Sequence, residues 1–169
     1  MLHGDNKGLV LPPTVAPIQV VIVPIITKEQ GGENQTSLCN KARELCESLK
    51  EGGVRVKVDD RNQYSPGWRY NHWELKGVPI RLELGPNDMR NRTAVLARRD
   101  TGTKVTVSWE RLKEVVASTL VTIHSNLITK ATKERDAHLF RATTWTEFMR
   151  GLDSKNLVLT PWCKNSKVL

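Results

Sequence analysis

Cysteine is scarce in this sequence, and the cysteines present do not form a metal-binding pattern. Only three occur among 169 residues, at Cys39, Cys46 and Cys163, without a Cys-x-x-Cys pair or histidines at zinc-finger spacing. Cys39 and Cys46 lie seven positions apart in a helical pattern, so they share roughly one face, where small apolar packing is expected. The sequence therefore predicts no metal site and favours a reducing compartment such as the cytoplasm.

Long hydrophobic runs are also missing. The best candidate, Val15 to Ile26, is too short to cross a bilayer and is interrupted by Pro17 and Pro24. The beginning of the chain, MLHGDNKG, lacks the basic-then-apolar order of a signal peptide. We expect no membrane segment.

The motifs of a self-sufficient enzyme are missing as well. No nucleophile–base pair, phosphate-binding glycine loop or metal cluster can be identified, so independent catalysis such as hydrolysis is not supported. Asp59 and Asp60 resemble an acid–base pair, but neighbouring residues of a strand point to opposite faces. We predict no catalytic residue and no cofactor within this chain.

Positive charge is abundant. Twenty-six Lys and Arg against 18 Asp and Glu give a net charge of +8. A polyanion approaching such a surface gains Coulomb energy and releases counterions. Nucleic acid is therefore a candidate partner, although basicity alone is common and needs a site to support it.

Strand-like and helix-like patterns alternate along the chain. Ile18 to Ile26 is a β-branched run typical of a buried strand, and Asn34 to Glu51 has helical apolar spacing. We also predict an extended strap at 8–17, strands at 54–58, 79–84, 93–99, 104–108 and 157–159, a turn at 85–88, and helices at 66–76, 109–136 and from the capping box 144–147 onward. In the long helix, the apolar side comprises Leu112, Val115, Val116, Leu120, Ile123, Leu127 and Ile128. The alternation predicts an α/β fold with a mixed sheet.

The helix at 66–76 is rich in aromatic residues. Tyr70 and Glu74 are four positions apart, so a ring and a carboxylate share one helix face. Single-stranded RNA is read by stacking bases on such rings and by hydrogen bonds to base edges. A carboxylate can accept the ring and amino N–H groups of guanine. The pair could hold a purine, and the simpler interpretation of Glu74 is an ordinary exposed helix charge.

Three later residues could add to this site. Arg81, on the following strand, can donate to guanine acceptors. Asp88, in the following turn, could supply a further contact. Lys104, just past the Thr101-Gly102 hairpin turn, suits phosphate or base acceptors.

Other polar and aromatic residues have simpler explanations. At least one of Trp68 and Trp73 is expected in the core, and His72 is expected to be a surface or structural residue. Arg69 is expected to face solvent or stack on Trp73. The run from Arg98 to Asp100 is most simply a solvated strand end.

The stretch DDRNQYSPGWRYNHWELKGVPIRLELGPNDM, at 59–89, closely resembles the anticodon-binding domain of prolyl-tRNA synthetases, which are class II aminoacyl-tRNA synthetases. The similarity extends to GDNKGLVLPPTVAPIQVVIVPI at 4–25, VLARRDTG at 95–102 and, more loosely, the remainder through Pro161. The resemblance implies a mixed, roughly five-stranded sheet flanked by helices. It also implies a target, the anticodon stem-loop of tRNA(Pro), because proline anticodons end in two guanines.

The resemblance also assigns roles. It implies that Tyr70 is the aromatic platform and that Glu74 and Arg81 read the guanines, with Asp88 and Lys104 as further anticodon contacts. The family's catalytic core, which binds ATP and proline, would lie upstream of this chain. The chain alone is therefore expected to be inactive, as a fragment of a proline--tRNA ligase.

The expected parts are the tail of the catalytic core with a linker at 1–16, the anticodon-binding domain at 17–162, and the start of a truncated C-terminal extension at 163–169. In that extension Cys163 matches the first of four zinc-binding cysteines in the family. The parent enzyme is expected to be a homodimer and the fragment a monomer. The alternative is a protein-interaction or accessory module that reuses the fold, but the intact set of Tyr70, Glu74 and Arg81 argues against it.

Overall fold

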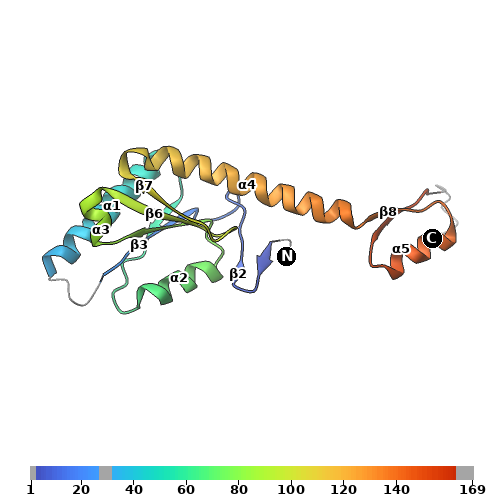
Figure 1. Cartoon of the computed structure of the whole chain (residues 1–169), viewed down its shortest axis with the longest axis horizontal. Helices are drawn as coiled ribbons and strands as arrows, with labels where there is room; N and C mark the ends of the chain where they lie inside the picture. Colours follow the sequence, from blue (N-terminus) through green and yellow to red (C-terminus); the bar gives the residue numbers. More distant parts are fainter. Residues whose placement is uncertain (1–2, 27–31, 163–169) are drawn as a thin grey trace. The chain divides into compact units, whose positions relative to one another are not determined.

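A computed structural model of the chain describes residues 3–26 and 32–162. It contains two compact units, Met1–Leu127 and Ile128–Leu169. The first unit is built on a five-stranded sheet in the order β4-β3-β5-β6-β7 (Figure 1). These strands are β3 (Val20–Pro24), β4 (Val56–Val58), β5 (Ile80–Leu84), β6 (Thr93–Arg98) and β7 (Lys104–Ser108). β3 pairs in parallel with β4 and β5, whereas β5, β6 and β7 are antiparallel, so the predicted mixed α/β sheet is confirmed.

Helices cover both faces of this sheet. Successive residues of a strand point to opposite faces, and all five residues of β3 are buried, so both of its faces are packed. On one face, Val20 and Ile22 of β3 join the main hydrophobic core with residues of α1 (Gly32–Glu51) and α4 (Leu112–Ala137). On the other face, Val21 and Val23 pack with Trp73 of α2 (Pro66–Leu75). Figure 1 shows α1 and α2 on opposite sides of the strands. Trp73 therefore packs α2, the aromatic helix, against this face of the sheet.

Helix α2 begins and ends as its sequence predicts. The Ser65 hydroxyl accepts a hydrogen bond from the Trp68 backbone N–H at 3.2 Å, and Pro66 occupies the first turn. At the other end Gly77 has a left-handed φ of +71°. An added Cβ on Gly77 would lie 2.7 Å from Leu9 Cβ, so the N-terminal segment packs directly on this helix end.

Gly77→Ala is expected to destabilise the protein more than Gly102→Ala, although the two glycines have nearly equal φ values of +71° and +72°. Both substitutions incur the penalty of a left-handed non-glycine residue, about 1 kcal/mol. Only Gly77→Ala adds a clash, because nothing lies within 4 Å of a Cβ on Gly102. Urea unfolding should show an additional loss of about 1–3 kcal/mol for Gly77→Ala. Equal losses would contradict the close packing at Gly77.

Three local predictions were wrong. The turn predicted at 85–88 is instead the start of helix α3 (Pro86–Asn91), because the Asp88 carboxylate caps it by accepting the Gly85 N–H at 2.9 Å. The strap at 8–17 is not uniformly extended: β1 (Gly4–Asp5) and β2 (Gly8–Leu9) form a hairpin, and a turn follows at 13–15. Ile128, predicted on the buried side of the long helix, is 54% exposed, one position past the last buried residue, Leu127.

A short 3₁₀ turn, Trp109–Arg111, precedes α4. The second unit contains β8 (Leu139–Arg141), α5 (Trp145–Asp153) and β9 (Leu157–Leu159). The predicted capping box is confirmed, since the Thr144 hydroxyl accepts the Glu147 N–H. The predicted last strand pairs in parallel with β8, a three-residue strand that the sequence pattern did not reveal. Within the described parts of the chain, no helix is long and apolar enough to span a bilayer.

Candidate functional site

The register of the sheet brings three strands together beside α2. Arg81 of β5 pairs with Ala97 of β6, which pairs with Lys104 of β7, so these residues form one row across the sheet. The row lies on the face that carries α2. A pocket of about 210 Å³ opens where helix and row meet. Its lining residues are Lys7, Val21, Trp73, Glu74, Val78, Arg81, Ala97, Arg98, Arg99, Gly102 and Lys104.

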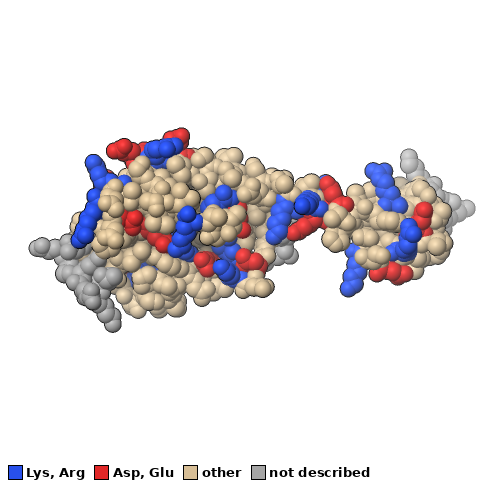
Figure 2. Space-filling model, in the orientation of Figure 1, with Lys and Arg blue, Asp and Glu red and all other residues tan. Residues whose placement is uncertain are grey.

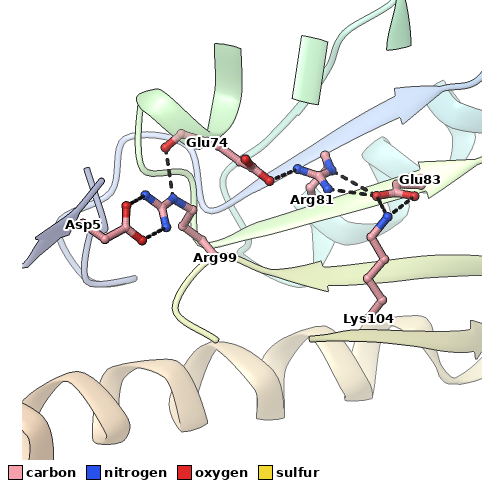
Figure 3. Close-up of polar contacts among 6 residues, drawn as sticks. All are labelled: Asp5, Glu74, Arg81, Glu83, Arg99 and Lys104. Carbon is pink, nitrogen blue, oxygen red and sulfur yellow. Dashed lines mark hydrogen bonds and ion pairs between the residues drawn. The ribbon is translucent and has the colours of Figure 1, made fainter. Parts of the chain in front are cut away.

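A chain of ion pairs connects the helix to the strands. Arg81 donates from Nη1 to Glu74 Oε1 at 2.9 Å and from Nη2 to Glu83 Oε1 at 3.0 Å. Lys104 Nζ lies 2.8 Å from Glu83 Oε1. Figure 3 shows these side chains converging from α2, β5 and β7. Because Glu83 is buried between two cations, it holds both in place.

Tyr70 lies beside this chain of charges. The Arg81 guanidinium carbon is 4.2 Å from the centre of the tyrosine ring, and Lys104 Nζ is 5.8 Å from it. Burial, together with the nearby Glu83 carboxylate, raises the pKa of Tyr70 to about 12. The phenol is protonated at neutral pH, and the guanidinium lies over its ring in a cation–π contact.

Of the five predicted contact residues, the structure brings four together: Tyr70, Glu74, Arg81 and Lys104. Asp88 is used differently. Its Oδ2 accepts the Gly85 N–H, and its Oδ1 accepts the Thr93 hydroxyl at 3.2 Å. In this state the carboxylate stabilises the start of α3, and its anticodon contact stays a prediction.

Two residues of the site were missed by sequence reasoning. Glu83 follows Arg81 by two positions on an alternating strand, and this spacing could have placed both on one face. Arg99, predicted as part of a solvated strand end, is only 8% exposed. It donates from Nε to the Glu74 backbone oxygen at 3.0 Å and forms two bonds with Asp5, so the prediction of a solvated end was wrong for Arg99.

A second buried arginine, Arg69, connects the first half of α2 to the ends of the strands. Arg69 is 1% exposed and donates to the backbone oxygens of Asp59 at 2.8 Å and Pro24 at 2.9 Å. The expectation that Arg69 faces solvent or stacks on Trp73 was therefore wrong: it satisfies two carbonyl groups at strand ends. The Asp59 carboxylate accepts from Trp73 Nε1 at 2.7 Å, whereas Asp60 pairs with Arg43, so the two acids do not form a joint site.

The two tryptophans of α2 have different environments. Trp73 is 4% exposed and belongs to the core, as predicted for at least one of them, while Trp68 is 42% exposed. Trp68 stacks between Tyr64 and His72, with ring centres 3.8 and 5.0 Å away. Burial, with help from Lys76, lowers the pKa of His72, which is partly buried in this stack.

The ion-pair network beside the pocket is balanced in charge, whereas the side chains that line the pocket include five basic residues and one acidic residue. On the face of the first unit that Figure 2 shows, acidic and basic side chains are interspersed. In the network of Figure 3, three carboxylates, from Asp5, Glu74 and Glu83, meet three cations, from Arg81, Arg99 and Lys104. Within this network the paired charges make oriented, charge-assisted hydrogen bonds.

Comparisons with known proteins identify the family of this chain. The chain is 45% identical to a proline--tRNA ligase of Encephalitozoon cuniculi over 96% of its own length and 33% of that protein. It is 42% identical to a cytoplasmic proline--tRNA ligase of Arabidopsis thaliana (99% and 31%) and 43% identical to a bifunctional glutamate/proline--tRNA ligase of Drosophila melanogaster (96% and 10%). It thus spans a third or less of these relatives. Residues 19–119, which contain the whole five-stranded sheet and α2, match the family described as "Anticodon binding domain", and the chain belongs to that family.

Proposed function

We propose that this chain binds the anticodon loop of proline tRNA and that, within a longer parent protein, it positions the tRNA for ATP-dependent prolylation by a catalytic core outside the chain. Membership of the anticodon-binding family and the names of its relatives support this proposal. The observation that carries it is the convergence of Glu74, Arg81 and Lys104 at one pocket, with the Tyr70 ring in contact with Arg81. A module that no longer reads RNA would not require this set, so the alternative of a protein-interaction module is not favoured.

Each side chain has a chemically distinct task in this proposal. The Glu74 carboxylate accepts the ring and amino N–H groups of a guanine, and Arg81 donates to guanine acceptors. Tyr70 and the Arg81 plane stack against bases. Lys104 contacts phosphate or base acceptors. When Glu74 turns from Arg81 to a base, Arg81 keeps its bond to Glu83, so no buried charge is left unpaired.

The test compares two RNA stem-loops. One carries the proline anticodon with its two guanines, and the other has both guanines changed to adenine. We expect the guanine stem-loop to bind roughly tenfold or more tightly per guanine, because adenine presents an acceptor where guanine presents a donor. Titration by fluorescence anisotropy at one fixed salt concentration measures both affinities. Equal affinities would overturn the proposal.

A further inference from the structure

The hairpin formed by β1 and β2 packs against the C-terminal end of α2. Gly8 has a φ of +123°, and an added Cβ there would lie 2.7 Å from Leu75 Cα. The Leu11 N–H donates to the Gly77 oxygen at 3.1 Å. The hairpin therefore approaches the helix end at backbone distance, close to Glu74.

One buried guanidinium joins the hairpin to the backbone of Glu74. Arg99 donates from Nη1 and Nη2 to the two carboxylate oxygens of Asp5, both at 2.7 Å. The Arg99 side chain is 5% exposed, and its Nε bonds the Glu74 oxygen at 3.0 Å. Figure 3 shows Arg99 lying between Asp5 and Glu74. All three nitrogens of this planar group have a partner, so its orientation is fixed.

The hydrogen bond from Arg99 reaches the last turn of α2, where the helical hydrogen bonds end. The last carbonyl groups of a helix lack intrahelical partners and must be satisfied from outside. The Glu74 oxygen accepts both the Gly77 N–H, at 3.0 Å, and Arg99 Nε. The Glu74 carboxylate, on the same residue, bonds Arg81 at the pocket. The direction of the carboxylate therefore depends on a backbone that Asp5 and Arg99 hold.

We infer that Asp5 and Arg99 are positioning residues for base selection: they hold the last turn of α2 so that Glu74 presents its carboxylate to a guanine. The inference rests on the proposed function. It makes the N-terminal hairpin part of the site, although neither Asp5 nor Arg99 has to touch RNA. A shift of the helix end by a fraction of an ångström would misalign the paired hydrogen bonds on which selection depends.

The test measures the ratio of affinities for the guanine and adenine stem-loops. Asp5→Asn should lower this ratio roughly three- to tenfold, which is the effect expected from weakening one hydrogen-bonded contact. The change should come mainly from weaker binding of the guanine stem-loop. Asp60→Asn is the matched control, because it weakens another Arg–Asp pair whose carboxylate is equally exposed, 43% against 45% for Asp5. The control should leave the ratio unchanged.

Two further variants separate positioning from a general loss of structure. Asp5→Glu retains a carboxylate and should recover part of the ratio. Arg99→Gln should lower the affinity ratio. The double variant Asp5→Asn with Arg99→Gln should lower the ratio no further than Arg99→Gln alone, because both residues act through the same contact. All measurements are made well below each variant's thermal transition. If the native chain discriminates and Asp5→Asn discriminates equally well, the inference fails while the proposed function stands; if the native chain does not discriminate, both fail.

Discussion

Glu74→Gln is expected to remove most of the preference for guanine. Glutamine offers one acceptor and one amino donor, so it can accept only one of the two N–H groups on the guanine edge and opposes the other. The same amide fits adenine, which presents a donor beside an acceptor. Affinity for the guanine stem-loop should fall roughly ten- to a hundredfold, and affinity for the adenine stem-loop should be unchanged or higher.

The fold should tolerate this substitution. Glu74 is one of two acids bound to Arg81, and Glu83 remains as a partner. The matched control is Glu44→Gln, which removes a carboxylate from an exposed helical pair with Lys41 on α1. That change should leave both affinities within about twofold. A Glu74→Gln variant with the native preference would show that another group reads the guanine edge.

Asp59→Ala should strongly destabilise the protein. The Asp59 carboxylate is 1% exposed and accepts from Trp73 Nε1 at 2.7 Å and from Arg61 Nε and Nη2, both at 2.7 Å. Alanine would leave the tryptophan N–H without its partner and open space under α2. We expect a loss of about 2–4 kcal/mol in the free energy of unfolding, measured by urea denaturation. Asp60→Ala, at the neighbouring exposed position, should cost less than about 1 kcal/mol.

The difference between the native chain and Asp59→Ala should depend on pH. Burial raises the pKa of Asp59, but hydrogen bonds from Arg61 and Trp73 outweigh it and lower the pKa from 3.8 to about 2. A group whose pKa is lower in the folded state stabilises the fold above its unfolded pKa and loses that effect as the pH falls. The stability gap should therefore be constant above about pH 5 and shrink between about pH 4 and pH 2. A gap that stays constant across this range would show that the carboxylate acts through its shape and not its charge.

The local part of the site could be predicted from the sequence. The spacing of Tyr70 and Glu74, the Ser65-Pro66 helix start and the alternation around Arg81 are short-range patterns, and the structure places them as expected. The partners of Arg81 on other strands depend on sheet register, which no short segment encodes. Lys104 could be placed after a hairpin turn, but its pairing with Glu83 requires β6 to lie between β5 and β7.

Arg69 and Arg99 show why the remainder could not be predicted. Both are charged, and charged residues are mostly exposed, so the general expectation for each was solvent. Each is buried where nitrogens of its guanidinium donate to oxygen atoms of other elements: strand-end carbonyl groups for Arg69, and the Asp5 carboxylate with a helix-end carbonyl group for Arg99. Such complementarity appears only after the elements have assembled. Cys163, matched in sequence to a zinc-binding position, lies outside the described residues.

The pair formed by Asp5 and Arg99 also bears on the order of folding. These residues are 94 positions apart, whereas Arg81 and Glu83 are two apart and Arg81 and Glu74 are seven apart. Contacts between distant residues close large loops and tend to form after local ones. The pocket should therefore gain its local ion pairs early in folding and its fixed helix end late.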